Sequence, residues 1–245
     1  MGDLDAGGVV TLTAIVTNHD YARYLPRCID SALAYCDEVL VYDDGSTDDS
    51  LAVLASYGDR IRVTHRDDAS GDPIWGSNLG IEQATSTHLL FLDADNYLTS
   101  QPPTNDVDYT FAPIDIVNEN TSPRTRWEYP DWPLDPGDCL DKFIASCTGG
   151  LAAGVMHAAG KPNMPFPWGG VWRTSFVKPL RWRAWPSTSF AADFRTALDW
   201  CMEGPSLAYS SQSFLAFRVH AGQWSDSPER ALMQRDAIEF ARSLI

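Results

Sequence analysis

The sequence lacks the features that mark several broad classes of protein. It has no run of about 18 apolar residues, the length of a membrane-spanning helix, so we expect no membrane span. None of its five cysteines forms a Cys-x-x-Cys pair, and their odd number fits free, buried thiols in a reducing compartment. Residues 1–5 are short and acidic, unlike a secretory signal. Together these absences predict a soluble, cytoplasmic protein.

Basic residues are also scarce. The chain has 18 lysines and arginines against 33 aspartates and glutamates, which gives a formal net charge of −15 at pH 7. An acidic surface repels phosphate backbones and anionic membranes at long range, so both partners are disfavoured, although a local basic cleft could still attract nucleic acid. No Gly-x-Gly-x-x-Gly follows a predicted strand, which argues against a dinucleotide-dependent oxidoreductase.

Alternating strand and helix patterns fill the first hundred residues. Apolar, β-branched runs predict buried parallel strands at residues 9–16, 38–42, 61–64 and 88–92. Helical patterns lie between these strands, and the second helix is predicted to be capped by Thr47. This β-α-β-α order predicts an α/β fold with a doubly wound, mostly parallel, Rossmann-like central sheet.

The composition changes after Ser100. Residues 101–170 are rich in Pro, Trp and Gly, with one predicted strand at residues 109–117. A helix near residues 191–202 and a strand at residues 214–219 follow. With 245 residues, of which 44% are hydrophobic, the chain is long enough for one sizeable core.

Acidic side chains follow two of the predicted strands, where ligands of doubly wound sheets bind. Asp93 and Asp95 are one residue apart just past a buried strand, so both can reach one divalent cation, and hard oxygen ligands suit Mg²⁺ or Mn²⁺. Such a cation can neutralise the charge of a departing diphosphate. Asp44 either belongs to a simple turn or accepts the imide N–H of a uracil-type base.

Three segments occur together in one order and spacing: TAIVTNHDYARYLPRCIDSAL, EVLVYDDGSTDDSL and GSNLGIEQATSTHLLFLDADN. In this combination the sequence resembles the family 2 glycosyltransferases, which have the GT-A fold. The resemblance covers about the first hundred residues. It implies a metal-dependent, inverting transfer of a sugar from a nucleotide-sugar donor, with a UDP-sugar favoured, to an acceptor that the sequence does not identify. It also implies a nucleotide-sugar-binding half at residues 1–100. Residues 101–245 would form an appended acceptor-binding and catalytic-base half with a C-terminal helix, within one fused domain.

The resemblance assigns roles to individual residues of this sequence. Thr17 and His19 match the loop that contacts the base, and Asp44 matches the acid that reads it. The implied donor-binding residues are Thr17, His19, Asp44, Asn78, Asp93 and Arg218. The implied metal ligands are Asp95, Asp93 and His220, with Asp95 the firmest. Ser77 stands where many relatives carry Arg, which leaves the diphosphate contacts in doubt.

The second half supplies the implied catalytic base and acceptor site. Asp193 matches the Asp of a family Glu-Asp pair, although Ala192 replaces the Glu and an acid here could simply favour a helix N-terminus. Trp168, Gly169, Gly170 and Trp172 match a Gly-rich acceptor loop, because Trp faces stack on sugar rings, with core packing as the alternative.

Two other functions remain as alternatives. A sugar-1-phosphate nucleotidyltransferase shares this type of sheet but needs a Gly-rich, Arg-containing loop after the first strand, where this chain has TNHDYAR. A non-catalytic nucleotide-sugar-binding pseudoenzyme is supported only by Ala192 and Ser77. The Gln-x-x-Arg-Trp signature of processive enzymes is absent, which favours single transfers.

Overall fold

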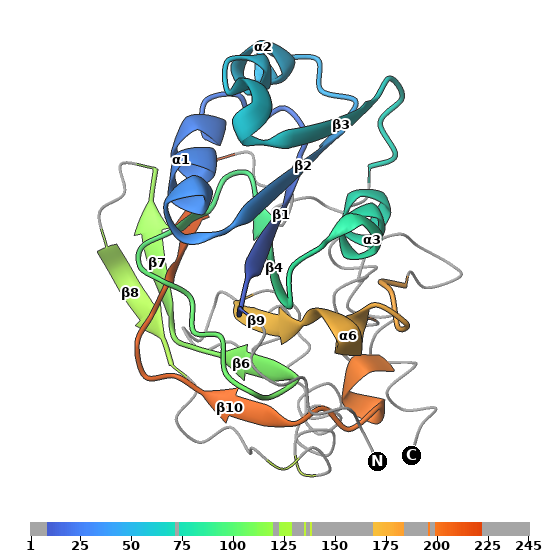
Figure 1. Cartoon of the computed structure of the whole chain (residues 1–245). Helices are drawn as coiled ribbons and strands as arrows, with labels where there is room; N and C mark the ends of the chain where they lie inside the picture. Colours follow the sequence, from blue (N-terminus) through green and yellow to red (C-terminus); the bar gives the residue numbers. More distant parts are fainter. Residues whose placement is uncertain are drawn as a thin grey trace, which may run out of the picture.

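The computed structural model describes residues 9–71, 74–119, 123–128, 135, 138, 169–183, 196 and 199–221. Its main feature is a seven-stranded sheet in the order β10-β6-β9-β4-β1-β2-β3 (Figure 1). The four strands predicted from the first hundred residues are β1 (Leu12–Asn18), β2 (Glu38–Asp44), β3 (Arg62–Arg66) and β4 (His88–Asp93). These four strands are parallel to one another, in the order β4-β1-β2-β3. The predicted α/β fold with a mostly parallel central sheet is therefore confirmed.

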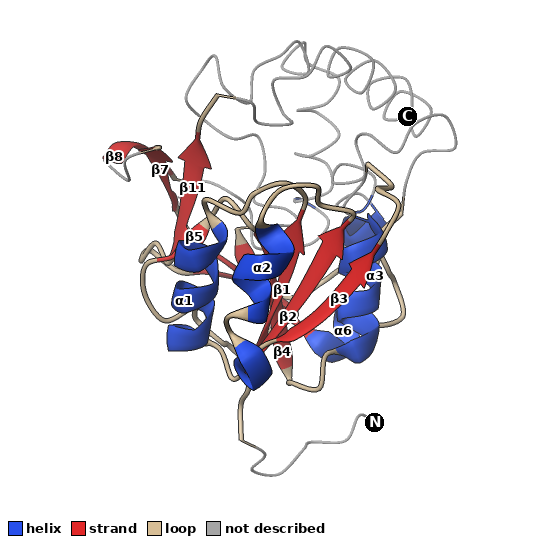
Figure 2. Cartoon of the chain, turned by 90° about the horizontal axis from the view of Figure 1, so that it is seen from above, coloured by secondary structure: helices blue, strands red, loops and turns tan. Residues whose placement is uncertain are grey.

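Helices cover both faces of this sheet, with α1 (Leu25–Tyr35) and α2 (Ser50–Ala55) on one side and α3 (Ile74–Gln83) and α6 (Thr174–Val177) on the other (Figure 2). A short 3-10 helix, Gly58–Arg60, leads from α2 into β3. Alternate side chains of β1 point to the two opposite faces of the sheet. Ile15 packs in the cluster of α3, while Val16 packs in the cluster of α1. Burial on both sides explains why the strand sequences are continuous apolar runs.

Helix α3 lies unusually close to β1. A Cβ on Gly80 would stand 2.4 Å from Cγ2 of Ile15, so only glycine allows the helix to approach the strand here. Packing against β1 thus explains why glycine stands at position 80, two residues after Asn78. The predicted Thr47 cap is wrong: Asp49 precedes α2, Asp48 accepts the Ser50 N–H at 2.9 Å, and the Thr47 N–H goes to Asp20.

The predicted strand at residues 109–117 is in fact two strands that join different sheets. β6 (Tyr109–Phe111) enters the seven-stranded sheet, and β7 (Ile114–Asn118) enters a four-stranded sheet of order β5-β11-β7-β8. Pro113 lies between them and has no N–H with which to continue a ladder. The other strands are β5 (Tyr97–Leu98), β8 (Pro123–Trp127), β9 (Gly170–Arg173), β10 (Leu207–Tyr209) and β11 (Leu215–Val219).

Strands from beyond residue 100 complete the sheet that the first hundred residues begin. β9 pairs with β4 in antiparallel fashion, β6 pairs with β9, and β10 pairs with β6. The two sequence halves therefore share one sheet. Among the residues that the structure describes, no helix has both the length and the apolar character needed to cross a bilayer.

Candidate functional site

The carboxyl ends of β1, β2 and β4 lie at one edge of the sheet because these strands are parallel and adjacent. The register places Thr17 beside Asp93. The Thr17 hydroxyl donates to Oδ1 of Asp93 at 3.2 Å, and the Thr17 carbonyl accepts the N–H of Ala94 at 3.0 Å. Two of the predicted donor-binding residues are thus brought together, and the loop that carries Asp95 is attached to β1.

Asp95 and His220 form the central pair of the site, although 125 positions separate them in the chain. Nε2 of His220 lies 3.1 Å from Oδ2 of Asp95, and both residues are buried, each 6% exposed. The imidazole packs against two aromatic rings, with its centroid 5.6 Å from that of Tyr21 and 4.6 Å from that of Tyr24. The sequence predicted both members as ligands of one cation, and the structure places them in contact.

The protonation of His220 reflects this pairing. Burial by itself lowers its pKa, but the hydrogen bond to Asp95, the carbonyl of Ala221 at Nδ1 and the charge of Asp95 together raise the pKa above its ordinary value. Nδ1–H of His220 donates a hydrogen bond to the carbonyl of Ala221, and Nε2 faces the carboxylate of Asp95.

The second carboxylate oxygen of Asp95 lacks the hydrogen bond that a buried polar atom normally has. Oδ1 is buried and has no hydrogen-bond partner among the described residues. A buried carboxylate oxygen without a partner costs about 1–3 kcal/mol or more, so such atoms in folded proteins call for a ligand. Within the described part of the chain, no three His, Cys, Asp or Glu side chains form a complete metal cluster.

Arg218 holds the Asp95 loop in place. It is only 3% exposed, its Nε donates to the carbonyl of Asp95 at 2.8 Å, and a terminal nitrogen donates to the carbonyl of Glu119 at 2.9 Å. Its backbone N–H donates to Oδ1 of Asn96 at 2.9 Å, and its guanidinium lies over the Tyr24 ring. These bonds give Arg218 a structural role, and its predicted contact with the donor phosphates stays a prediction.

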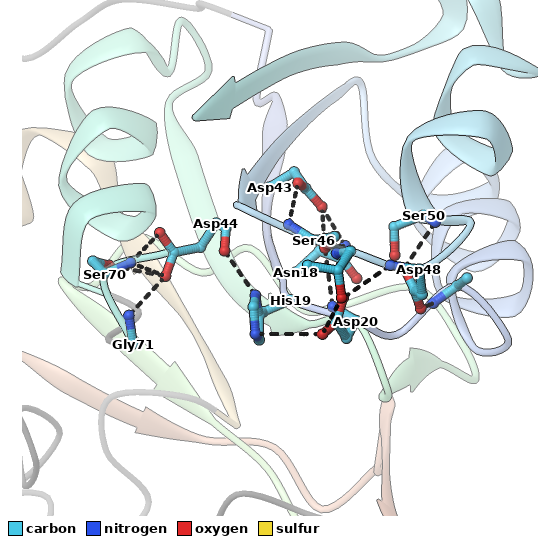
Figure 3. A network of polar contacts seen from close by, with 12 residues as sticks. Asn18, His19, Asp20, Asp43, Asp44, Ser46, Asp48, Ser50, Ser70 and Gly71 are labelled. Carbon is cyan, nitrogen blue, oxygen red and sulfur yellow. Dashed lines mark hydrogen bonds and ion pairs between the residues drawn. The ribbon is translucent and has the colours of Figure 1, made fainter. Parts of the chain in front are cut away.

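Asp44 lies at the predicted edge, but its carboxylate is engaged (Figure 3). It accepts the N–H and hydroxyl of Ser70 at 3.0 and 2.9 Å and the N–H of Gly71 at 3.1 Å, and Nε of Arg66 lies 3.4 Å away. His19 contacts the same residue from β1, with Nδ1 donating to the Asp44 carbonyl at 2.7 Å. His19 and Asp44 are thus adjacent, as the predicted base site requires.

Asp43, which the sequence analysis did not single out, stabilises this edge of the sheet through hydrogen bonds. Its fully buried carboxylate accepts from Nδ2 of Asn18 at 2.6 Å and from the Ser46 hydroxyl at 2.6 Å (Figure 3). Nδ1 of His65 lies 2.9 Å from the same carboxylate. Burial raises the pKa of Asp43, but these hydrogen bonds outweigh it and leave the pKa below its ordinary value. The sequence could have indicated this role, because neighbouring side chains of a strand point to opposite faces of the sheet and the two adjacent acids must therefore have different surroundings.

Three other predicted site residues have structural roles. Both polar atoms of the Asn78 amide bond the Trp182 main chain, at 3.0 and 2.7 Å, in place of a donor contact. Trp172 is fully buried and stacks on Tyr109 at 3.9 Å, so it has no exposed face for a sugar, and the core-packing alternative is correct. A Cβ on Gly170 would stand 2.3 Å from the Tyr109 ring, so this glycine also serves core packing.

The remaining predicted residues keep their status as predictions. Gly169 is buried with a φ of 97°, a left-handed conformation that favours glycine. Asp193 and Trp168 lie outside the described residues.

The described residues thus form a doubly wound sheet whose parallel strands end in polar loops, with a buried Asp–His pair beside them. Comparison with known proteins shows that residues 13–102 are similar to glycosyl transferase family 2.

Individual relatives are similar over different lengths. The chain is 24% identical to an uncharacterized glycosyltransferase from Nostoc over 92% of its own length and 70% of the relative. It is 31% identical to the hyaluronan synthase of Pasteurella multocida over 47% of its own length, but spans only 13% of that protein. The crystal structure of Staphylococcus aureus TarS 1–349 in complex with UDP-GlcNAc superposes with a TM-score of 0.62, at 17% identity, over 95% of this chain and 66% of that one.

Proposed function

We propose that this protein transfers a sugar from a nucleotide-diphosphate donor, with UDP-sugars favoured, in a metal-dependent reaction that inverts the anomeric centre. The observation that carries this proposal is the buried Asp95–His220 pair with the unpartnered Oδ1 of Asp95. Asp95 follows β4 at the edge where Thr17 and Asp93 meet, and His220 follows β11. The UDP and UDP-GlcNAc complexes of TarS, which shares the fold, support a UDP-sugar donor.

The residues at the pair fit Mn²⁺ or Mg²⁺. Carboxylate oxygen suits both ions, an imidazole nitrogen is compatible with Mn²⁺, and such ions take their remaining ligands from substrate phosphates and water. Asp95 and His220 would hold the ion, with Asp93 nearby. When bound, it would supply positive charge that neutralises the departing diphosphate.

The rest of the chain would bind and orient the substrates. Thr17, His19 and Asp44 come from adjacent strand ends and would form the base site. Asp193 is our candidate for the base that removes the acceptor's proton as the acceptor attacks the anomeric carbon. Residues 101–245 would provide the acceptor site, and the acceptor itself stays open.

Donor hydrolysis tests this function without knowledge of the acceptor. The protein is incubated with a panel of nucleotide sugars and Mn²⁺, and release of the nucleoside diphosphate is measured. We expect slow release from one UDP-sugar, none after EDTA, and none from an Asp95→Asn variant. Release that EDTA leaves unchanged would refute the metal dependence. Metal-dependent donor binding without release from any sugar would instead favour a pseudoenzyme, and consumption of a nucleoside triphosphate with a sugar 1-phosphate would favour a nucleotidyltransferase.

A further inference from the structure

The segment Asp67–Gly71, which we name the strap, leaves the end of β3 and lies on the turn that follows β2. Its residues are exposed, yet its main chain approaches Gly45 very closely. A Cβ on Gly45 would stand 2.6 Å from the backbone nitrogen of Ala69, and Gly45 also has a φ of 68°. Both the close approach and the left-handed backbone require glycine here. The turn is therefore shaped to receive the strap.

The strap is held chiefly by the carboxylate of Asp44. The N–H of Ser70 lies 3.0 Å from both Oδ1 and Oδ2, and Oδ2 also accepts the Ser70 hydroxyl at 2.9 Å and the Gly71 N–H at 3.1 Å. Arg66 approaches Oδ1 to 3.4 Å. Oδ2 thus receives three donors from the strap, which is more than its two lone pairs. A base that used Oδ2 of Asp44 as its acceptor would have to displace the strap.

We propose that the strap is a lid on the base site, docking on Asp44 in the absence of donor and leaving when a base takes its place. This inference rests on the proposed function, since it takes Asp44 as the acid that reads the base. The exchange is chemically matched, because the imide N–H of uracil is the same kind of donor as the amides of Ser70 and Gly71. The N3 atom of cytosine carries no proton and cannot replace them. The lid thus adds discrimination for uracil over cytosine.

A competing lid lowers the apparent affinity for the donor by the fraction of molecules in which the lid is open. Weakening the lid should therefore tighten nucleotide binding. Gly71 has a φ of 72°, and no atom lies within 4 Å of a Cβ placed there. Gly71→Ala should destabilise the docked strap through backbone strain alone, with no steric clash. We expect the Kd for UDP to fall about three- to tenfold.

Gly58→Ala is the matched control. Gly58 has a φ of 55°, has no atom within 4 Å of a Cβ, and precedes β3 at the end opposite the strap. It should suffer the same backbone strain but leave the Kd for UDP unchanged. Ser70→Ala, which removes only the hydroxyl donor, should tighten UDP binding by a smaller factor than Gly71→Ala.

The experiment is calorimetric titration of wild type and the three variants with UDP in the presence of Mn²⁺, together with hydrogen exchange of residues 67–71. We expect tighter binding by Gly71→Ala and faster exchange of the strap amides when UDP is added to wild type. Weaker or unchanged binding by Gly71→Ala, or slower exchange with UDP, would show that the strap is part of the bound site and overturn the proposal. If neither wild type nor Gly71→Ala binds UDP, both the donor assignment and the lid are wrong. Binding by wild type with no gain in the variant removes the lid alone.

Discussion

Replacement of Asp95 by Asn gives a direct test of the ligand-binding role of the buried pair. In wild type, Oδ2 of Asp95 faces His220 at 3.1 Å, while Oδ1 is buried without a partner. Asn keeps the shape but removes the charge. The loss of a charge-assisted hydrogen bond costs about 1.5–3 kcal/mol, and relief of the buried, partly unpaired charge returns a similar amount. In EDTA the melting temperature of Asp95→Asn should therefore stay within a few degrees of the wild-type value.

Wild type and Asp95→Asn should differ in how much added ligands raise their melting temperatures. A ligand present at one hundred times its Kd stabilises the folded state by about 2.7 kcal/mol. For a chain of this size, 1 kcal/mol corresponds to roughly 2–4 °C in melting temperature. Mn²⁺ and UDP together should thus raise the wild-type melting temperature by roughly 5–10 °C, and by much less in Asp95→Asn, because the variant cannot couple the cation to the diphosphate.

Differential scanning fluorimetry with Mn²⁺, UDP, both or neither measures these shifts. Asp106→Asn is a suitable control, because it makes the same substitution at an exposed carboxylate that pairs with Arg173, before β6. It should retain the full wild-type response to Mn²⁺ and UDP. Equal responses of Asp95→Asn and wild type would show that Asp95 is not a metal ligand, and the ligand model of the site would have to be abandoned.

Two further predictions concern the scaffold. Gly170→Ala should lower the free energy of unfolding by about 1–3 kcal/mol in urea titrations, because its Cβ would overlap the Tyr109 ring; an unchanged midpoint would contradict the close packing. Asp43→Asn should lower stability by about 1–3 kcal/mol at pH 7. Because the folded-state pKa of Asp43 lies below its ordinary value of 3.8, its contribution is complete above that value and is lost as the pH falls further, so the difference between Asp43→Asn and wild type should shrink below about pH 4. A difference that grows in acid would refute this assignment, and His65 should be replaced in parallel because it faces the same carboxylate.

The sequence predicted the strands and helices that follow from the periodicity of apolar residues. It did not predict the roles of side chains whose partners lie in distant segments. The four parallel strands and the acids at their ends follow from local patterns, because strands buried on both faces leave continuous apolar runs. Asn78 and Arg218 were assigned to the donor, yet their polar atoms bond the main chain of Trp182 and Asp95. Those partners lie 104 and 123 positions away, and no local pattern encodes them.

The candidate site, too, was predicted in part from the sequence. The resemblance to a known family predicted that Asp95 and His220 act together, and the structure places their side chains in contact. The role of Trp172 could not be predicted from the sequence, because a tryptophan on a glycine-rich strand can face a sugar or the core. The stack on Tyr109 shows that it faces the core. The engagement of Asp44 by Ser70 also had no signal in the sequence.

The bonds that Arg218 makes to the Asp95 loop have a consequence for any attempt to recombine such proteins. Residues 13–102 carry the family match, but the side chain that fixes their most important turn is supplied from β11, near the far end of the described chain. A chimera that exchanges everything after residue 100 as one block also exchanges this clamp, so a donor half taken from one enzyme is not a self-sufficient module. A graft that keeps Leu215–Val219 and His220 from the same parent as the donor half preserves the alignment of the two pieces.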